Sequence, residues 1–175
     1  MSYSIRAKSS ISSSDSWIQN RNRRQRISMA WKILMAQQTD TEHLLPLRKA
    51  LWSHMSLEDH RNELQGFFKD PLFSVFVAKD SNDAIVAFAE VMQKPHANGC
   101  PHSPILFLEG IWTHPDFRRK GISRALIDAI ESLAQERKIP ALASDALIEN
   151  TSSHSAHLAW GFKEDERVVC YSKPL

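Results

Sequence analysis

Apolar positions recur with a helical period in several stretches of the chain. Between residues 121 and 138, apolar side chains follow one another at offsets of 0, 3, 4, 7, 8 and 11, which predicts an amphipathic helix. We expect this helix to end at Pro140, because proline cannot continue a helix. The same kind of spacing predicts further helices over residues 41–52, 57–68 and 151–160.

Shorter apolar runs, rich in β-branched and aromatic residues, lie between these helices and predict strands. They cover residues 31–35, 73–78, 84–92, 105–112, 141–144 and 168–172. The turn residues of 80–83 predict a hairpin between the second run and the third. This order of elements favours an α/β (α+β) fold, with a mixed, mostly antiparallel sheet and helices on both faces.

The length of 175 residues suits one folded domain with a sizeable core. Residues 1–28 are rich in serine and arginine and show no hydrophobic period. We therefore expect them to be a disordered leader, or to precede a true start at Met29, and we expect a single domain over residues 29–175.

Two absences in the sequence exclude further classes of protein. No apolar run reaches the roughly 18 residues of a membrane helix, so we expect no membrane partner. The only cysteines, Cys100 and Cys170, have neither the number of a disulfide scaffold nor the spacing of a zinc site. These features indicate a cytoplasmic protein without a bound metal.

Charge is distributed unevenly along the chain. The first 28 residues carry six basic side chains and one acidic side chain, so the formal net charge of +2 leaves −3 for residues 29–175. An acidic folded part behind a basic leader argues against nucleic acid as the main partner and leaves room for a cationic ligand.

A basic turn precedes the helix predicted over residues 121–138. Arg118, Arg119 and Lys120 come directly before Gly121, whose lack of a side chain lets the backbone approach a ligand closely. Unpaired N–H groups and the positive end of the helix dipole lie at the same place. The turn therefore predicts a phosphate site, with a solvated basic loop as the alternative.

The basic turn resembles the acyl-CoA signature of the GNAT acetyltransferase superfamily. That signature reads Arg/Gln-x-x-Gly-x-Gly/Ala between a strand and a long helix, and Arg118-x-x-Gly121-x-Ser123 matches it with serine at the third position. The flanking motifs are similar to those of bacterial aminoglycoside 6′-N-acetyltransferases. These motifs are Phe-Leu-Glu-Gly-Ile at 107–111, Ala-Ser-Asp at 143–145, Asn150, and the Gly-Phe ending from 161.

The resemblance runs from about residue 31 to the C-terminus. It implies a GNAT fold with a splayed central strand pair. It also implies acetyl transfer from acetyl-CoA to the 6′-amine of an aminoglycoside, which confers antibiotic resistance, and a homodimer.

The resemblance implies a cofactor site along the strand and the turn. Pantetheine and the thioester carbonyl would lie on residues 111–113, where a backbone N–H can stabilise the charge that develops on the thioester oxygen. The pyrophosphate would lie on residues 118–123. The implied cofactor-binding residues are Ile111, Trp112, Thr113, Arg118, Arg119, Lys120, Gly121, Ile122, Ser123 and Asn150. Asn150 would serve equally well as a helix cap.

Glu109 stands inside an otherwise apolar run. By the period of two, it lies on the same strand face as Ile105, Phe107 and Ile111. Because an isolated buried charge is costly, this carboxylate needs either a structural ion pair with an arginine or a pocket that faces a cation.

The resemblance also implies a substrate site for a polycation. Its residues are Trp52, His96, Glu109, Asp145 and Glu166, although His96 stands where close relatives have tyrosine and Trp52 could be core packing. Attack on the thioester needs a neutral amine, and Glu109 or Asp145 is the candidate base.

His157 lies four residues before the Gly161-Phe162 pair, where many superfamily members have a tyrosine that protonates the leaving thiolate. The resemblance implies that His157 is a general acid, and a surface or packing histidine is the alternative. Cys100 and Cys170 lack a base at a defined spacing, so we expect direct attack in a ternary complex. Two other functions stay open: an acetyltransferase for a polyamine or peptide amine, and a non-catalytic acyl-CoA-binding protein.

Overall fold

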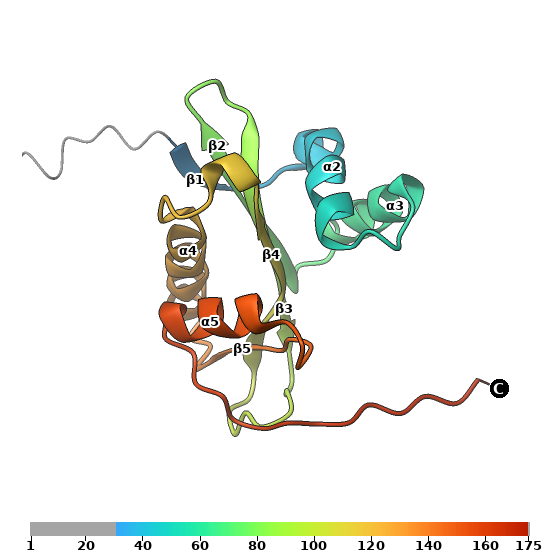
Figure 1. Cartoon of the computed structure of the whole chain (residues 1–175), viewed down its shortest axis with the longest axis vertical. Helices are drawn as coiled ribbons and strands as arrows, with labels where there is room; N and C mark the ends of the chain where they lie inside the picture. Colours follow the sequence, from blue (N-terminus) through green and yellow to red (C-terminus); the bar gives the residue numbers. More distant parts are fainter. Residues whose placement is uncertain (1–30, 175) are drawn as a thin grey trace, which may run out of the picture. The chain divides into compact units, whose positions relative to one another are not determined.

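Five of the six predicted apolar runs form a five-stranded sheet in the computed structural model, which describes residues 31–174 (Figure 1). The strands are β1 (Trp31–Met35), β2 (Phe73–Asp80), β3 (Ile85–Lys94), β4 (Ile105–Thr113) and β5 (Leu142–Ser144). They lie in the order β1-β2-β3-β4-β5; the first four pair antiparallel, and β5 pairs parallel with β4. The mixed, mostly antiparallel sheet is therefore confirmed, while the expected leader and Met29 lie outside the described residues.

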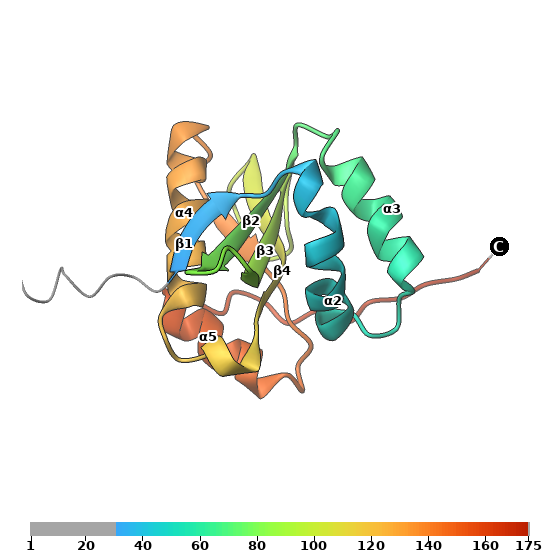
Figure 2. The ribbon, with the colours of Figure 1, turned by 90° about the horizontal axis from the view of Figure 1, so that it is seen from above.

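Helices cover both faces of this sheet, as predicted. They are α2 (Thr41–Leu51), α3 (Leu57–Phe67), α4 (Ile122–Glu136) and α5 (Thr151–Trp160), with short 3₁₀ turns η1 (Gln38–Asp40) and η2 (Pro115–Phe117). Figure 2 shows α4 on one face and the pair α2 and α3 on the other. Within residues 31–174, no helix has both the length and the apolar character needed to cross a bilayer.

The alternation of side chains along the central strands divides the core into two clusters. On one face Leu126 and Ile130 of α4 are fully buried among residues of β2, β3 and β4. On the other face Leu44 of α2 and Leu64 of α3 pack against Phe88 of β3. Each fully buried leucine or isoleucine stabilises the fold by about 1.5–3 kcal/mol, so the sheet is a firm platform for the loops at its edge.

β4 contains a bulge at Glu109. Glu90 pairs with Gly110 and Val91 pairs with Leu108, which leaves Glu109 as the extra residue. Beyond the bulge, Ile111 packs into the cluster under α4, whereas Phe107 and Glu109 both contact Lys94. The prediction that Ile111 shares a face with Glu109 is therefore wrong, because the bulge interrupts the period of two.

β4 and β5 separate after a short parallel contact. They pair only where residues 106–108 meet residues 142–144, although β4 continues to Thr113. Within the described chain, the edge of residues 109–113 that faces away from β3 has no strand partner. This gap is the splayed strand pair that the resemblance implies.

The long helix α4 ends earlier than predicted. Lys138 adopts a left-handed conformation (φ 57°), and its N–H donates to the carbonyl oxygen of Gln135 over 3.1 Å. The N–H of Ile139 donates to the carbonyl oxygen of Ala134 over 2.8 Å. This Schellman arrangement closes the helix at Glu136, ahead of Pro140.

The strand predicted over residues 168–172 is not formed. Residues 162–174 contain neither helix nor strand. Val169 and Tyr171 are 74% and 92% exposed. A run of apolar residues is typical of a strand, but no other segment of residues 31–174 pairs with this one.

Candidate active site

The backbone of the basic turn is shaped by two residues with positive φ. Arg119 has φ 59° and Gly121 has φ 84°. A Cβ at Gly121 would meet no protein atom within 4 Å, so its conformation accounts for the glycine and the space before it is open. No side chain caps the start of α4, and its first N–H groups remain available to a ligand.

The three cations of the turn are exposed and form no ion pair with any side chain of residues 31–174. Arg118 Nε donates to the carbonyl oxygen of Thr113 over 3.0 Å, which ties the turn to the end of β4. The Lys120 ammonium lies 5.0 Å from the centre of the Phe117 ring. The turn therefore concentrates positive charge that the described chain does not neutralise.

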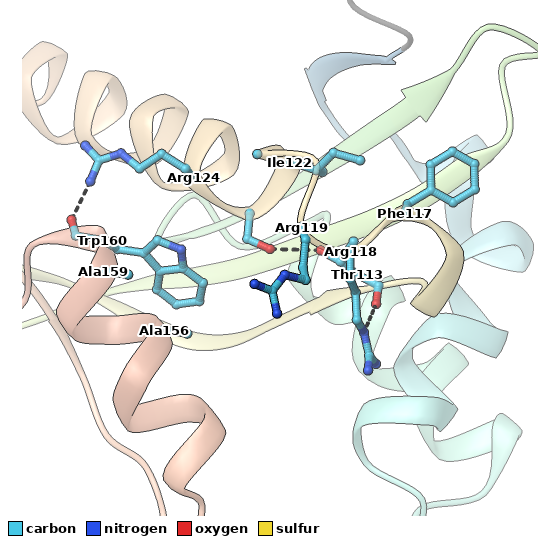
Figure 3. A pocket seen from close by; sticks show the side chains of 11 residues that line it. Thr113, Phe117, Arg118, Arg119, Ile122, Arg124, Ala156, Ala159 and Trp160 are labelled. Atoms are coloured by element: carbon cyan, nitrogen blue, oxygen red, sulfur yellow. Dashed lines mark hydrogen bonds between the residues drawn. The ribbon is translucent and has the colours of Figure 1, made fainter.

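A cavity of about 320 Å³ opens between this turn and α5 (Figure 3). Its lining residues are Thr113, Phe117, Arg118, Arg119, Gly121, Ile122, Ser123, Arg124, Ala156, Ala159 and Trp160. Arg124 of α4 donates to the carbonyl oxygen of Trp160 and so joins the two walls. One wall is cationic and the other is mostly apolar, which suits a phosphate attached to an organic group.

Several of the predicted cofactor residues have their side chains engaged within the fold. Ile122, the first residue of α4, is 1% exposed and packs into the cluster between α4 and the sheet, while Trp112 packs on the opposite face, toward α2. Thr113 and Ser123 share a hydrogen bond of 3.0 Å between their hydroxyl oxygens. Asn150 caps α5, because its side-chain oxygen accepts from the N–H of Ser153 over 3.1 Å.

Glu109 forms an ion pair, but with a lysine and not with an arginine. Lys94 Nζ lies 2.7 Å from Glu109 Oε1 and 3.9 Å from the centre of the Phe107 ring. The side chains of Glu109 and Lys94 are 27% and 30% exposed. Water reaches the pair, and a cationic ligand can compete with Lys94 for the carboxylate.

The strand register brings Glu109 and Asp145 to the same place. Leu108 and Ser144 are the last paired residues of β4 and β5, and the two acids follow them directly. Asp145 is exposed and forms no ion pair with another side chain of residues 31–174. Two carboxylates therefore lie at the point where the strands diverge.

The remaining predicted substrate residues lie in two places: His96 and Glu166 at the loop that joins β3 to β4, and Trp52 against β4. His96 is exposed in this loop, and a Cβ at Gly99 would lie 3.1 Å from Cβ of Glu166, so the C-terminal segment passes against the loop. Trp52 follows α2, and a Cβ at Gly110 would overlap its indole ring. The indole therefore packs against the bulge beside Glu109, as the core-packing alternative expects.

His157 is half-buried and makes contacts through its whole ring. Its Nδ1 lies 2.8 Å from the carbonyl oxygen of Ser153, and its Nε2 lies 3.0 Å from Ser144 Oγ. The rings of Trp160 and Phe162 lie 5.2 Å and 5.1 Å away, centre to centre. These contacts place His157 against β5, and it is not a free surface histidine.

A buried ionic cluster that was not predicted from the sequence lies between α2, α3 and β3. Arg48 Nε lies 2.8 Å from Glu90 Oε1, and another nitrogen of Arg48 lies 2.9 Å from Glu63 Oε2. Arg48 also donates to the carbonyl oxygen of His60 over 3.0 Å. Arg48 and Glu90 are 2% and 1% exposed. A signal existed, because Glu90 stands in an apolar run as Glu109 does.

Burial shifts the titration of this cluster. It raises the pKa of Glu90 to about 7, although Arg48 acts in the opposite direction. Burial lowers the pKa of His60, and the neighbouring Arg48 charge lowers it further. Glu90 pairs with Gly110, so this buried structural cluster lies one position along β4 from Glu109 of the open site.

Cys100 is half-buried and Cys170 is exposed, and both are free thiols. Over residues 31–174, no three side chains of His, Cys, Asp or Glu are grouped in a way that could hold a metal.

Comparison with known proteins gives consistent matches over most of the chain. Residues 36–162 match the Acetyltransferase (GNAT) family. An aminoglycoside N(6′)-acetyltransferase type 1 of Serratia marcescens is 41% identical over 144 residues, which cover 82% of this chain and 99% of the relative. The enzyme of the same name from Stenotrophomonas maltophilia is 35% identical over 85% of this chain and 97% of its own.

Solved structures resemble the fold closely. AAC(6′)-Iy in complex with the bisubstrate analog CoA-S-monomethyl-acetylneamine has a TM-score of 0.79 and 33% identity, and the match covers 83% of this chain and 99% of that one. AAC(6′)-Ih from Acinetobacter baumannii has the same TM-score at 31% identity, with the same coverage.

Proposed function

The chain belongs to the GNAT family of acetyltransferases, and we propose that it transfers acetyl from acetyl-CoA to the 6′-amine of aminoglycoside antibiotics. The observation that carries this proposal is the match to nearly the full length of relatives named for this reaction. Acetylation removes one positive charge from the antibiotic, and the enzyme thereby confers resistance. The family match to residues 36–162 also supports one catalytic domain over residues 29–175.

Acetyl-CoA is the co-substrate, and the basic turn fits its pyrophosphate. The open space before Gly121, the free N–H groups of α4 and three cations without ion pairs in the described chain all favour an anion there. The unpaired edge of residues 111–113 can bind the pantetheine arm as an added strand. A backbone N–H of that edge, directed at the thioester oxygen, would stabilise the negative charge of the transition state.

The acceptor amine binds on the acidic side of the diverging strands. Glu109, Asp145 and Glu166 supply carboxylates for the ammonium groups of the antibiotic, with Trp52 and His96 beside them. Each pair of opposite charges near 4 Å gains a gross ~4 kcal/mol at an effective dielectric constant of about 20, before the cost of desolvation. Several carboxylates therefore select a polycation over a substrate with a single charge.

Asp145 is the base that takes the proton from the attacking amine. Both candidate acids lie where the strands diverge, but Lys94 already neutralises Glu109. Asp145 is exposed and forms no ion pair within residues 31–174, which supports its role as proton acceptor, directly or through a water molecule. The amine then attacks the thioester directly, because the sequence gives neither cysteine a base at a defined spacing that could make it a nucleophile.

The enzyme acts as a homodimer in the cytoplasm. Val169 and Tyr171 are exposed in a segment with the apolar composition of a strand, and β5 is the last strand of the sheet. A second copy of the chain can pair with β5 and cover Val169 and Tyr171, which would remove the strand edge and these two side chains from water. The two free cysteines support a reducing compartment.

A thiol-release assay across a panel of amines tests the function. We expect rapid release of CoA with kanamycin or tobramycin, and mass spectrometry should place the acetyl group on the 6′-nitrogen. If the enzyme acetylated only spermidine or a peptide amine, that amine and not an aminoglycoside would be its substrate. Binding of CoA without thiol release on any amine would contradict catalysis altogether.

A further inference from the structure

Lys94 occupies a site with the chemistry that binds a free ammonium group. Its Nζ lies 2.7 Å from Glu109 Oε1 and 3.9 Å from the centre of the Phe107 ring. A carboxylate supplies the opposite charge, and the face of an aromatic ring attracts a cation through its quadrupole. Glu109 and Phe107 therefore form an ammonium subsite, and the side chain that fills it belongs to the protein itself.

The ammonium group of Lys94 is free to leave this subsite. It has three N–H donors, but Glu109 is its only acidic partner within residues 31–174. The side chains of Lys94 and Glu109 are 30% and 27% exposed, so water can replace either partner. Lysine also carries its charge on a flexible four-carbon stem. The buried pair of Arg48 and Glu90 has no such freedom, because these side chains are only 2% and 1% exposed.

The ammonium subsite lies on the acceptor side of the diverging strands. Lys94 is the last residue of β3 and pairs with Ile105 at the start of β4. Its side chain contacts Phe107 and ends at Glu109, which follows the last pair between β4 and β5. Asp145 follows the same pair on the other strand. A cation that reaches these two acids therefore meets the Lys94 ammonium at one of them.

We propose that Lys94 is an internal competitor of the acceptor and sets its affinity. In the free enzyme the Lys94 ammonium fills the subsite of Glu109 and Phe107, and an ammonium group of the bound acceptor displaces it. The inference rests on the proposed function, and it adds a residue that determines how tightly the acceptor binds. No bond forms or breaks in this exchange, because one ammonium ion replaces another.

The tether of Lys94 to the protein decides which ligands can displace it. A tethered group competes at a high effective concentration, and it lowers the affinity of every ligand that uses Glu109 by the same factor. A small cation held by Glu109 alone binds too weakly to overcome this factor at low concentration. A polycation keeps further contacts with Asp145 and Glu166 while one of its ammonium groups replaces Lys94. The competitor therefore leaves the site open to polycations in practice.

The substitution Lys94→Met removes the competitor and keeps an apolar side chain against Phe107. We expect the KM for kanamycin to fall about threefold to tenfold, because an exposed ion pair is weak and occupies only part of the binding-competent population. The kcat and the KM for acetyl-CoA should stay unchanged. Lys94→Arg keeps the charge and should bind kanamycin no more tightly than wild type. Lys32→Met, which removes an exposed lysine paired with Asp83 on another strand, is the matched control.

A second background separates competition for Glu109 from general repulsion of cations. Calorimetric titration of kanamycin into the protein with bound CoA gives a Kd without turnover. Lys94→Met should lower this Kd in the wild-type background and leave it unchanged in Glu109→Gln, since a competitor has no effect once its carboxylate is gone. An equal fall in both backgrounds would overturn the proposal, because Lys94 would then act only through its positive charge.

The outcomes distinguish the competitor from the proposed function. Thiol release with kanamycin, together with an unchanged or higher Kd in folded Lys94→Met, would overturn the competitor and leave acetyl transfer intact. The expected pattern of Kd values without thiol release on any amine would overturn acetyl transfer and support Lys94 as a competitor for a bound polycation. A failure of kanamycin to bind to wild type or to any variant would overturn both.

Discussion

Two regions of this protein differ in whether their arginine and lysine side chains have acidic partners. Between α2 and β3, Arg48 is 2% exposed and directs its guanidinium to Glu90, Glu63 and a backbone carbonyl. At the start of α4, the cations of residues 118–120 are exposed and have no carboxylate partner in the described chain. A buried charge whose partners all lie within the protein stabilises the fold. Exposed charges without partners, next to free N–H groups, indicate a site for an anionic ligand.

The two acids of the diverging strands repeat this contrast on a smaller scale. Glu109 is paired with Lys94, while Asp145 forms no ion pair within residues 31–174. Acids that form an ion pair within the protein therefore stabilise it, whereas acids without an ion pair are immediately available to bind a substrate. Removing one or two of these charges at a time should show which of them act on stability and which on activity.

Asp145→Asn should give the largest effect, and on activity alone. Loss of the base should lower kcat/KM for kanamycin by about 10²- to 10⁴-fold, while acetyl-CoA affinity and the free energy of unfolding stay unchanged. Steady-state thiol release and CoA titration measure the two quantities. Glu109→Gln, which removes an acid already paired with Lys94, should lower kcat/KM less. Equal turnover of both variants and wild type would remove these acids from the mechanism.

Arg48→Met should affect stability first. It leaves Glu90 buried without its partner, and breaking such a buried pair costs about 3–5 kcal/mol in the free energy of unfolding. Urea denaturation measures this loss. Arg61→Met is the matched control, because Arg61 binds Glu42 and Glu58 at the surface, and its loss should be much smaller. Similar losses in the two variants would mean that burial does not set the strength of these pairs.

Glu90→Gln should remove a pH dependence from stability. The pKa of Glu90 rises from an ordinary value near 4.5 to about 7 on folding, so the folded state resists its ionisation. Wild type should therefore lose up to about 3 kcal/mol relative to the variant as pH rises from 4.5 to 7, and no more above that. The lowered pKa of His60 has the opposite effect, but it is present in both proteins and cancels in the difference. A difference that stays constant over this range would contradict the raised pKa.

The double substitution Arg119→Ala with Lys120→Ala should give the smallest change. We expect the KM for acetyl-CoA to rise roughly tenfold, about 1.4 kcal/mol, with kcat and stability unchanged. The difference from wild type should shrink at high ionic strength, because salt screens exposed charges. Lys69→Ala, an exposed lysine after α3, is the control. An equal rise in KM for that control would mean that the turn has no special role.

Local features of the fold were predictable from the sequence because they depend on neighbours in the chain. The offsets within residues 121–138 predicted α4, and the sequence before Gly121 predicted a basic turn that leads into this helix. Features that need a distant partner were not predictable. The bulge at Glu109 depends on the register of β3, and the Arg48–Glu90 pair joins residues 42 positions apart. The segment over 168–172 has the pattern of a strand, but a pattern alone cannot supply an edge to pair with.

The structure of the chain in complex with CoA is the most direct test of where the coenzyme binds. The pyrophosphate should lie on the first N–H groups of α4, beside Arg119 and Gly121, and the pantetheine should follow residues 111–113 with its sulfur near the point where β4 and β5 diverge. CoA bound outside the gap between β4 and β5, or a sulfur far from Asp145, would contradict this account.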